Sequence, residues 1–132
     1  MVWTSDEIAA RVAREIASEK LVSLGVGIPC KVAEYVDKTG PVMLHSANGI
    51  LGLTSQNQND TSIDRVTNAE GRPSSTRSGG SFFDINSSVT MMRGGHIDVA
   101  ILEATQVDQE GNLANRQATD PQNFGIGSSM DL

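Results

Sequence analysis

The sequence predicts a single α/β domain with a largely parallel sheet and helices on both faces. Two apolar runs of strand length, residues 21–26 and 96–103, alternate with segments of helical periodicity. A strand with a fully apolar centre, flanked by helices in the sequence, is typical of burial on both faces of a parallel sheet. With 132 residues, 38% of them hydrophobic, the chain can build one core, so we expect residues 1–132 to form one domain.

The first third of the chain predicts two helices and two strands. Residues 4–20 read as an amphipathic helix, because apolar residues recur every four positions and Thr4 with Glu7 fits a capping box. A short buried strand, residues 21–26, follows and ends in a glycine turn. Pro29 then opens a second helix, since proline suits the first helical position. The next strand, residues 42–45, runs directly into a turn of small residues.

The middle of the chain is polar, and helices and strands are predicted again only after residue 80. Residues 54–80 contain few large apolar side chains, which predicts a loop, a lid or a segment that faces a partner. The elements expected after it are a short strand (81–85), a capped helical turn ended by glycine (86–95), the strand 96–103, and a hairpin or turn with Gly111 at its tip (106–115).

Composition excludes several classes of function. The net charge of -6 and the absence of a Lys/Arg cluster argue against nucleic-acid binding, which requires positive charge against phosphates. Cys30 is the single cysteine, so we expect no disulfide within the chain, no cysteine-based metal site and a reducing, cytoplasmic location. No apolar run approaches the roughly 20 residues that span a bilayer, and we expect no membrane association.

Chemistry in α/β proteins tends to lie where strands end, and two strand ends here carry small residues. The corner from Gly25 to Pro29 brings glycines to a helix start, an arrangement that suits an anion, but Gly-x-Gly alone is a weak signal and an ordinary turn explains it as well. Cys30 beside this corner is either a nucleophile or a small buried hydrophobe. His45 and His96 are also candidates for acid/base chemistry, and the two histidines with Asp98 could hold a metal in principle, but we expect no metal site.

Short motifs occur in a fixed order along nearly the whole chain. They are Trp3 with Glu7-Ile8-Ala9-Ala10-Arg11, Leu24-Gly25-Val26-Gly27-Ile28-Pro29, Ser46-Ala47-Asn48-Gly49-Ile50-Leu51-Gly52, Asn68-Ala69, Gly80-Ser81-Phe82-Phe83-Asp84, Met92-Arg93-Gly94-Gly95-His96-Ile97-Asp98, Gln106-Val107-Asp108, Gly111-Asn112-Leu113-Ala114-Asn115 and Met130-Asp131-Leu132. This series resembles the β (or B) subunits of family I coenzyme A transferases, which include 3-oxoacid, acetoacetate and 3-oxoadipate CoA-transferases.

The resemblance implies a fold of the NagB/RpiA/CoA-transferase type and a ping-pong reaction. CoA would move between an acyl-CoA, either 3-oxoacyl or short-chain, and a carboxylic acid through an enzyme-bound thioester. CoA and acyl-CoA would be substrates, with no tightly bound cofactor. The implied partner is an α subunit, in a heterodimer or heterotetramer, with self-association as the alternative. Family β subunits continue past Met130-Asp131-Leu132, so the chain is expected to be C-terminally truncated relative to them.

The resemblance also assigns the site, and there the chain departs from the family. The nucleophilic glutamate of the family corresponds to Ala47, so we expect impaired activity. Glu103, where the family leads us to expect a small residue, is either a relocated carboxylate or a solvated acid at a strand end. The residues expected around the CoA and substrate pocket are Gly25, Gly27, Pro29, Ser46, Asn48, Gly49, Gly94 and Gly95.

Two other functions remain open. A homologue that kept the fold and lost the nucleophile could serve as a non-catalytic binding or assembly module. A sugar-phosphate isomerase-like enzyme on the same fold is the other alternative, although the Gly-Gly-His-Ile-Asp motif does not support it.

Overall fold

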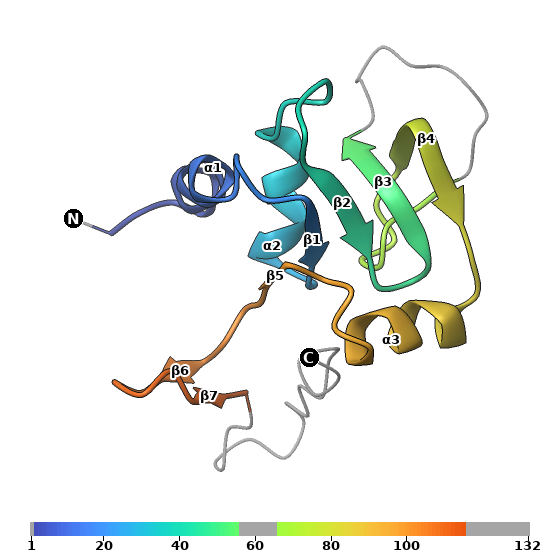
Figure 1. Ribbon diagram of the computed structural model, residues 1–132. Coiled ribbons are helices and arrows are strands. Elements are labelled where there is room, and N and C mark those ends of the chain that lie inside the picture. Colours follow the sequence, from blue (N-terminus) through green and yellow to red (C-terminus); the bar gives the residue numbers. More distant parts are fainter. Residues whose placement is uncertain (1, 56–65, 116–132) are drawn as a thin grey trace.

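The computed structural model describes residues 2–55 and 66–115, which form a five-stranded sheet with helices and a separate two-stranded hairpin (Figure 1). The elements are α1 (Ser5–Glu15), β1 (Leu21–Leu24), α2 (Ile28–Lys31), the 3₁₀ helix η1 (Val32–Glu34), β2 (Met43–Ser46), β3 (Ile50–Ser55), β4 (Ser74–Phe82), α3 (Ile85–Arg93), β5 (Val99–Ile101), β6 (Gln106–Val107) and β7 (Leu113–Ala114).

The strand order in the sheet is β4-β3-β2-β1-β5. β1 runs parallel to both of its neighbours, and Leu24 pairs with Ser46 on one side and with Ile101 on the other. The three parallel strands therefore end at the same edge of the sheet. β3 and β4 extend the sheet beyond β2 as antiparallel strands. The predicted α/β class with parallel strands at its centre is confirmed, and the antiparallel extension was not anticipated.

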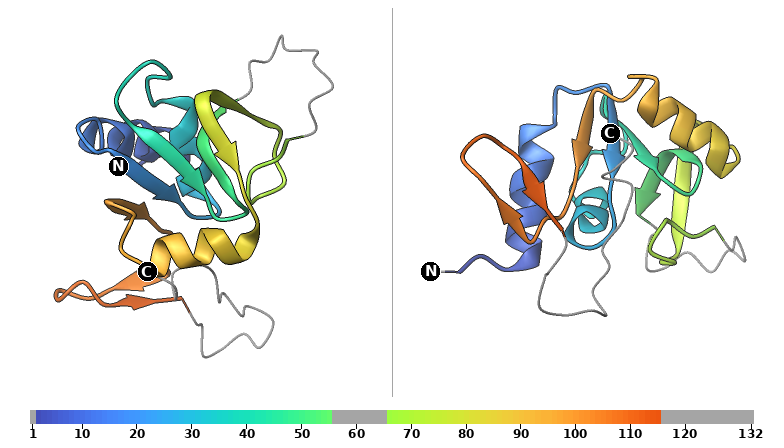
Figure 2. Two further views of the ribbon diagram at one scale, coloured as in Figure 1. Left: turned by 45° about the vertical axis from the view of Figure 1, so that its right-hand side comes forward. Right: turned by 90° about the horizontal axis from the view of Figure 1, so that it is seen from below.

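Side chains of a strand alternate between the two faces, and here the faces differ in polarity. Val22, Leu24 and Leu44 belong to the apolar core, which they share with residues of α1, α2 and η1. Ser23 and His45, on the opposite face, contact α3 through Met92 and Ser88. Helices thus cover both faces, as predicted, and Figure 2 shows α3 set apart from α1 and α2.

The first helix begins as predicted and ends early. The Thr4 hydroxyl accepts a hydrogen bond from the Glu7 amide at 3.2 Å, and the Glu7 carboxylate accepts one from the Thr4 amide at 2.7 Å, so the capping box is present. α1 ends at Glu15, not Lys20, because the chain has to reverse before β1 begins at Leu21. Pro29 lies in the first turn of α2, as expected.

Two predictions about the polar middle of the chain were wrong. Residues 50–52, read as part of a turn, and residues 54–55, read as loop, belong to β3, and residues 74–80, also read as loop, belong to β4. β4 is an edge strand that pairs through its backbone with β3, so it needs few apolar side chains. The predicted strand 81–85 divides between the end of β4 and the start of α3. Residues 56–65 of the predicted loop lie outside the described residues.

The end of the described chain is partly as predicted. β5 covers only Val99–Ile101, and its residues are half-buried, not buried on both faces, because it is the edge strand of the described sheet. The hairpin is confirmed: β6 and β7 pair antiparallel, and Gly111 adopts φ +84° at the turn. Within the described residues, no helix is both long enough and apolar enough to cross a membrane.

Candidate active site

Three segments of the predicted site meet at the edge where the parallel strands end. The chain leaves β2 at Ser46, β1 at Leu24 and β5 at Ile101, so Ala47, the corner from Gly25 to Pro29, and Glu103 all follow strand ends on one side of the sheet. Neighbouring strands lie about 4.8 Å apart, which puts the ends of β2 and β5 roughly 10 Å apart across β1.

The turn between β2 and β3 requires glycine at position 49. The Gly49 amide donates to the Ser46 carbonyl at 2.9 Å, and the Gly49 carbonyl accepts from the Phe83 amide at 3.0 Å. Gly49 adopts φ +105°, and a Cβ atom there would overlap the Phe83 carbonyl oxygen. Glycine is therefore required at position 49 for two reasons: the backbone is left-handed there, and the chain before α3 leaves no room for a side chain.

Residues 67–69 hold the turn from a second side. The buried Ser46 hydroxyl accepts a hydrogen bond from the Ala69 amide at 3.0 Å, and the Asn48 side-chain amide donates to the Thr67 carbonyl at 2.8 Å. Asn68 is itself buried, and its side-chain oxygen accepts from two backbone amides of the Asn68–Arg72 turn. Two motifs that are about 20 residues apart in the sequence thus form one structure.

The third support of the turn is a buried polar network under α3. The His45 ring lies with Nδ1 3.0 Å from the Ser23 hydroxyl and Nε2 3.0 Å from the Ser88 hydroxyl, and Ser88 donates to the Ala47 carbonyl at 2.8 Å. Burial lowers the pKa of His45 below its ordinary value. The sequence did not predict this network. The only available signal was the alternation of the strand, in which His45 faces the side opposite to the core residue Leu44.

Glu103 lies in the first glycine corner. Its carboxylate accepts a hydrogen bond from the Ile28 amide at 3.1 Å. Gly27 adopts φ +89°, and a Cβ atom at that position would overlap the Glu103 carboxylate. The Glu103 side chain therefore fills this corner.

Cys30 is a buried thiol that donates to the Gly25 carbonyl at 3.2 Å. Burial, and then the negative charge of Glu70, raise the pKa of Cys30 to about 11. The thiolate is the reactive form of cysteine, so this environment favours the buried-hydrophobe alternative over the nucleophile.

Gly94 and Gly95 are not brought to the same edge. They follow the last residue of α3, and Asp98 nearby accepts from the Leu21 amide at 2.8 Å, where β1 begins. These glycines therefore lie near the starts of the parallel strands, away from Ala47. His96 is exposed in the same region, and no group of three metal-ligating side chains occurs among the described residues.

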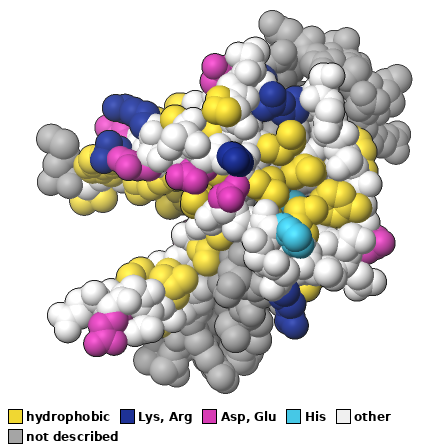
Figure 3. Space-filling model, in the orientation of Figure 1, with side chains coloured by type: hydrophobic (Ala, Val, Ile, Leu, Met, Phe, Trp, Pro, Cys, Tyr) yellow, Lys and Arg dark blue, Asp and Glu magenta, His cyan; other side chains and the backbone are white. Residues whose placement is uncertain are grey.

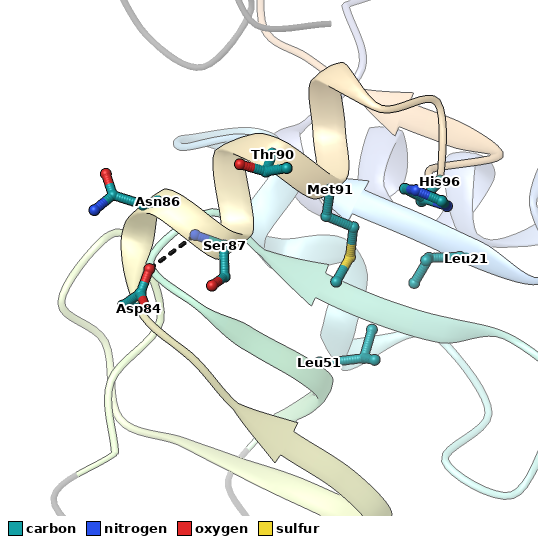
Figure 4. Close-up of a pocket in the computed structure, with 8 residues that line it drawn as sticks. All are labelled: Leu21, Leu51, Asp84, Asn86, Ser87, Thr90, Met91 and His96. Atoms are coloured by element: carbon teal, nitrogen blue, oxygen red, sulfur yellow. Dashed lines mark hydrogen bonds between the residues drawn. The ribbon is translucent and has the colours of Figure 1, made fainter.

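Two of the hollows in the described part of the molecule flank the sheet, and residues 46–49 line neither of them. A cavity of about 710 Å³ lies beside α3, lined by Leu21, Leu51, Asp84, Asn86, Ser87, Thr90, Met91 and His96 (Figure 4). Hydrophobic side chains gather around a histidine on this side of the molecule (Figure 3). A second hollow, of about 470 Å³, lies between the two N-terminal helices, β5 and the hairpin, and its lining includes Pro29 and Glu103.

The sequence is similar to coenzyme A transferases over nearly its whole length. Residues 5–121 match the family model described as coenzyme A transferase. The chain is 40% identical to the beta subunit of the acetate CoA-transferase of Haemophilus influenzae, over 95% of this chain and 56% of that protein. It is 38% identical to the B subunit of the 3-oxoadipate CoA-transferase of Acinetobacter baylyi, over 98% of this chain and 60% of that protein.

A mitochondrial relative is similar over the same region. The succinyl-CoA:3-ketoacid coenzyme A transferase 2B of Mus musculus is 39% identical over 95% of this chain, which corresponds to 24% of that protein. The chain spans little more than half the length of the two bacterial subunits. Together with the turn at residues 46–49 and the α/β fold, the match shows that the chain belongs to the coenzyme A transferase family and corresponds to its β, or B, subunits.

Proposed function

We propose that this chain acts as the β-type subunit of a CoA-transferase and that Ala47 leaves it impaired. The observation that carries the proposal is the position of residue 47, half-buried and held at the edge where β1, β2 and β5 end. The surrounding bonds come from Ser46, Asn48, Gly49 and Ser88, and none of them involves the side chain of residue 47. A longer side chain at this position is expected to leave those bonds in place.

The proposed chemistry requires a carboxylate at position 47. Such a carboxylate attacks the thioester carbonyl of an acyl-CoA, the bond to sulfur breaks, and a mixed anhydride forms as CoA thiolate leaves. The thiolate then attacks the enzyme carbonyl of the anhydride and releases the first acid, which leaves CoA bound to the enzyme as a thioester. A second acid accepts the CoA by the reverse sequence. The side chain of Ala47 has no oxygen that could attack the thioester.

Glu103 is a weaker candidate for the attacking group. It follows β5, so it stands two strands from residue 47 and not in the same turn. One oxygen of its carboxylate already accepts a hydrogen bond from the Ile28 amide at 3.1 Å. This geometry supports a structural role, in which Glu103 fills the glycine corner.

The partner and the substrates belong to the same proposal. The relatives are named as beta or B subunits, which supports pairing with an α-type subunit that completes the substrate cleft. Their names include acetate and 3-oxoadipate, so the acids are proposed to be short-chain or 3-oxo carboxylic acids. CoA and acyl-CoA are proposed as substrates, with no tightly bound cofactor.

The test is to restore the carboxylate. We expect Ala47→Glu, assayed with an α-type subunit and acetoacetyl-CoA, to raise the rate of acyl-CoA exchange by several orders of magnitude over the unaltered chain, since removal of a nucleophile costs about that much. Borohydride treatment followed by mass measurement should detect the thioester at residue 47. Activity of the unaltered chain that Glu103→Ala abolishes would instead make Glu103 the nucleophile.

A non-catalytic role is the second candidate, and the alanine at position 47 favours it. A module of this kind would bind CoA or the α-type subunit without turning over. Calorimetry with CoA distinguishes the two: binding by both the unaltered chain and Ala47→Glu, without exchange by either, supports the module.

A further inference from the structure

The hydrogen-bond network under α3 joins the centre of the sheet to the backbone of residue 47. His45 and Ser88 are both fully buried, at 0% exposure. Burial of polar groups is unfavourable unless each finds a partner, and a strand that needed only packing would use apolar residues here. His45 and Ser88 are satisfied by each other, and the last acceptor in the chain of bonds is the Ala47 carbonyl.

The positions of the protons between His45 and the Ala47 carbonyl follow from that last acceptor. A carbonyl oxygen cannot donate, so the single hydroxyl proton of Ser88 points to the Ala47 carbonyl at 2.8 Å. Ser88 must then accept from His45, which places a proton on Nε2. His45 is fully buried, which lowers its pKa and favours the neutral ring, in which Nδ1 is the acceptor and faces the Ser23 hydroxyl at 3.0 Å. The Ser23 hydroxyl also lies 3.9 Å from the Met92 sulfur, a longer and weaker contact. In this arrangement His45 is a neutral imidazole with its proton on Nε2.

The bond to the Ala47 carbonyl also sets the orientation of the next amide. The carbonyl of residue 47 and the N–H of Asn48 belong to one planar trans peptide, so they point in opposite directions. Drawing the carbonyl under α3 turns the Asn48 N–H away from α3. The same peptide fixes the backbone from which the side chain of residue 47 leaves.

We propose that His45 and Ser88 are positioning residues, which orient the peptide of residue 47 for reaction through a Ser23–His45–Ser88 relay. The inference rests on the proposed function as far as the reaction is concerned. Its structural part, a relay that holds the peptide, stands independently of activity. Neither residue touches substrate in this proposal, and both act through the backbone of residue 47.

A spectroscopic experiment on the unaltered chain decides the structural part. Nitrogen-15 spectra of the histidine rings should show His45 with Nε2 protonated and Nδ1 unprotonated. Ser88→Ala should shift both the His45 Nε2 resonance and the Asn48 backbone amide resonance, while Thr90→Ala on the same helix should leave both in place. A protonated Nδ1, or an Asn48 resonance that Ser88→Ala does not move, overturns the inference even if the chain transfers CoA.

A kinetic experiment in the Ala47→Glu background tests the effect on reaction. Added Ser88→Ala should lower kcat about 10- to 100-fold and change KM by less than about twofold, because misplacement of a reacting group reduces turnover more than binding. His45→Gln, which keeps a donor near the Nε2 position, should retain more of the rate than His45→Leu.

Failure of the positioning role and failure of the proposed function give different results. A kcat that Ser88→Ala leaves unchanged removes the role in reaction. An Ala47→Glu chain that stays inactive while the Ser88→Ala shifts appear removes the proposed function and leaves the relay in place.

Discussion

At the scale of single residues, position 47 is surrounded by atoms that belong to its neighbours. The Ser46 hydroxyl and the Asn48 amide group both bind the segment 67–69, and the Gly49 backbone binds Phe83. Ala47 itself contributes its carbonyl, which accepts from Ser88. The turn can therefore keep its shape with alanine where the family resemblance implies glutamate, and fold and activity are separable at this residue.

Gly49→Ala should lower the free energy of unfolding by more than the roughly 1–3 kcal/mol of an unfavourable backbone conformation alone. The added Cβ meets the Phe83 carbonyl as well as a φ of +105°. Gly71→Ala is the matched control, because Gly71 has φ +79° and open space around its Cβ position. Urea denaturation of both variants gives the comparison, and equal losses would show that the contact with Phe83 has no effect on stability.

At the scale of elements, α3 connects the site to the sheet, and its N-terminus is stabilised by the N-cap residue Asp84. The Asp84 carboxylate accepts from the Ser87 amide at 2.8 Å, which holds the pKa of Asp84 below its usual value. Ser88, which binds the Ala47 carbonyl, lies in the first turn of the same helix. The capped first turn of α3 therefore fixes Ser88, which in turn supports the backbone of residue 47.

Asp84→Ala should lower the free energy of unfolding by about 1 kcal/mol, the usual value of a lost N-cap. Asp84→Asn should lower it by only a few tenths, since asparagine caps nearly as well and loses only the favourable interaction of charge with the helix dipole. Urea denaturation at neutral pH measures both. A loss of the same size in the two variants would assign the effect to charge and not to the cap.

Elements with a local signal were predictable, and those defined by distant pairing were not. The capping box at Thr4 and the glycine at the tip of the hairpin are read from a few adjacent residues, and both are present. β4 is polar and stable only because β3 pairs with it, so its sequence alone gives no sign of a strand. The family motifs marked the turn at residue 47, but not the bonds that Ser88 and Ala69 make to it.

At the scale of the whole molecule, the sheet has an apolar face under α1 and α2 and a polar network under α3. The stability of the second face depends on the protonation of His45. Folding buries this imidazole in its neutral form, which lowers its pKa relative to the unfolded chain. The polar face is thus sensitive to mild acid.

The free energy of unfolding should fall as the pH drops below about 6.5, because the unfolded chain then binds a proton that the folded His45 does not. The stabilisation is present above that pH and is lost toward the lower pKa of the folded state. The carboxylates with lowered pKa values, Glu7, Asp37, Asp84 and Asp108, lose their contributions only below about pH 4. Urea denaturation between pH 7 and pH 5, roughly the range of histidine titration, measures this dependence apart from the carboxylates.

His45→Gln should flatten this dependence, because it removes the buried imidazole. A slope that persists in His45→Gln would mean that another group is responsible.

The bond from Ser88 to the Ala47 carbonyl also has a consequence for the order of folding. It joins residues 41 positions apart, and the bond from Ala69 to Ser46 joins residues 23 apart. Closing loops of this length is entropically unfavourable, so such contacts tend to form after the local ones. We expect Ser88→Ala to accelerate unfolding and to leave the refolding rate nearly unchanged in stopped-flow measurements. Slower refolding of this variant would mean that the contact forms early. In the order expected here, β2, β3 and α3 form first, and the contacts that fix the turn at residue 47 against Ser88 and Ala69 are the last that the chain acquires.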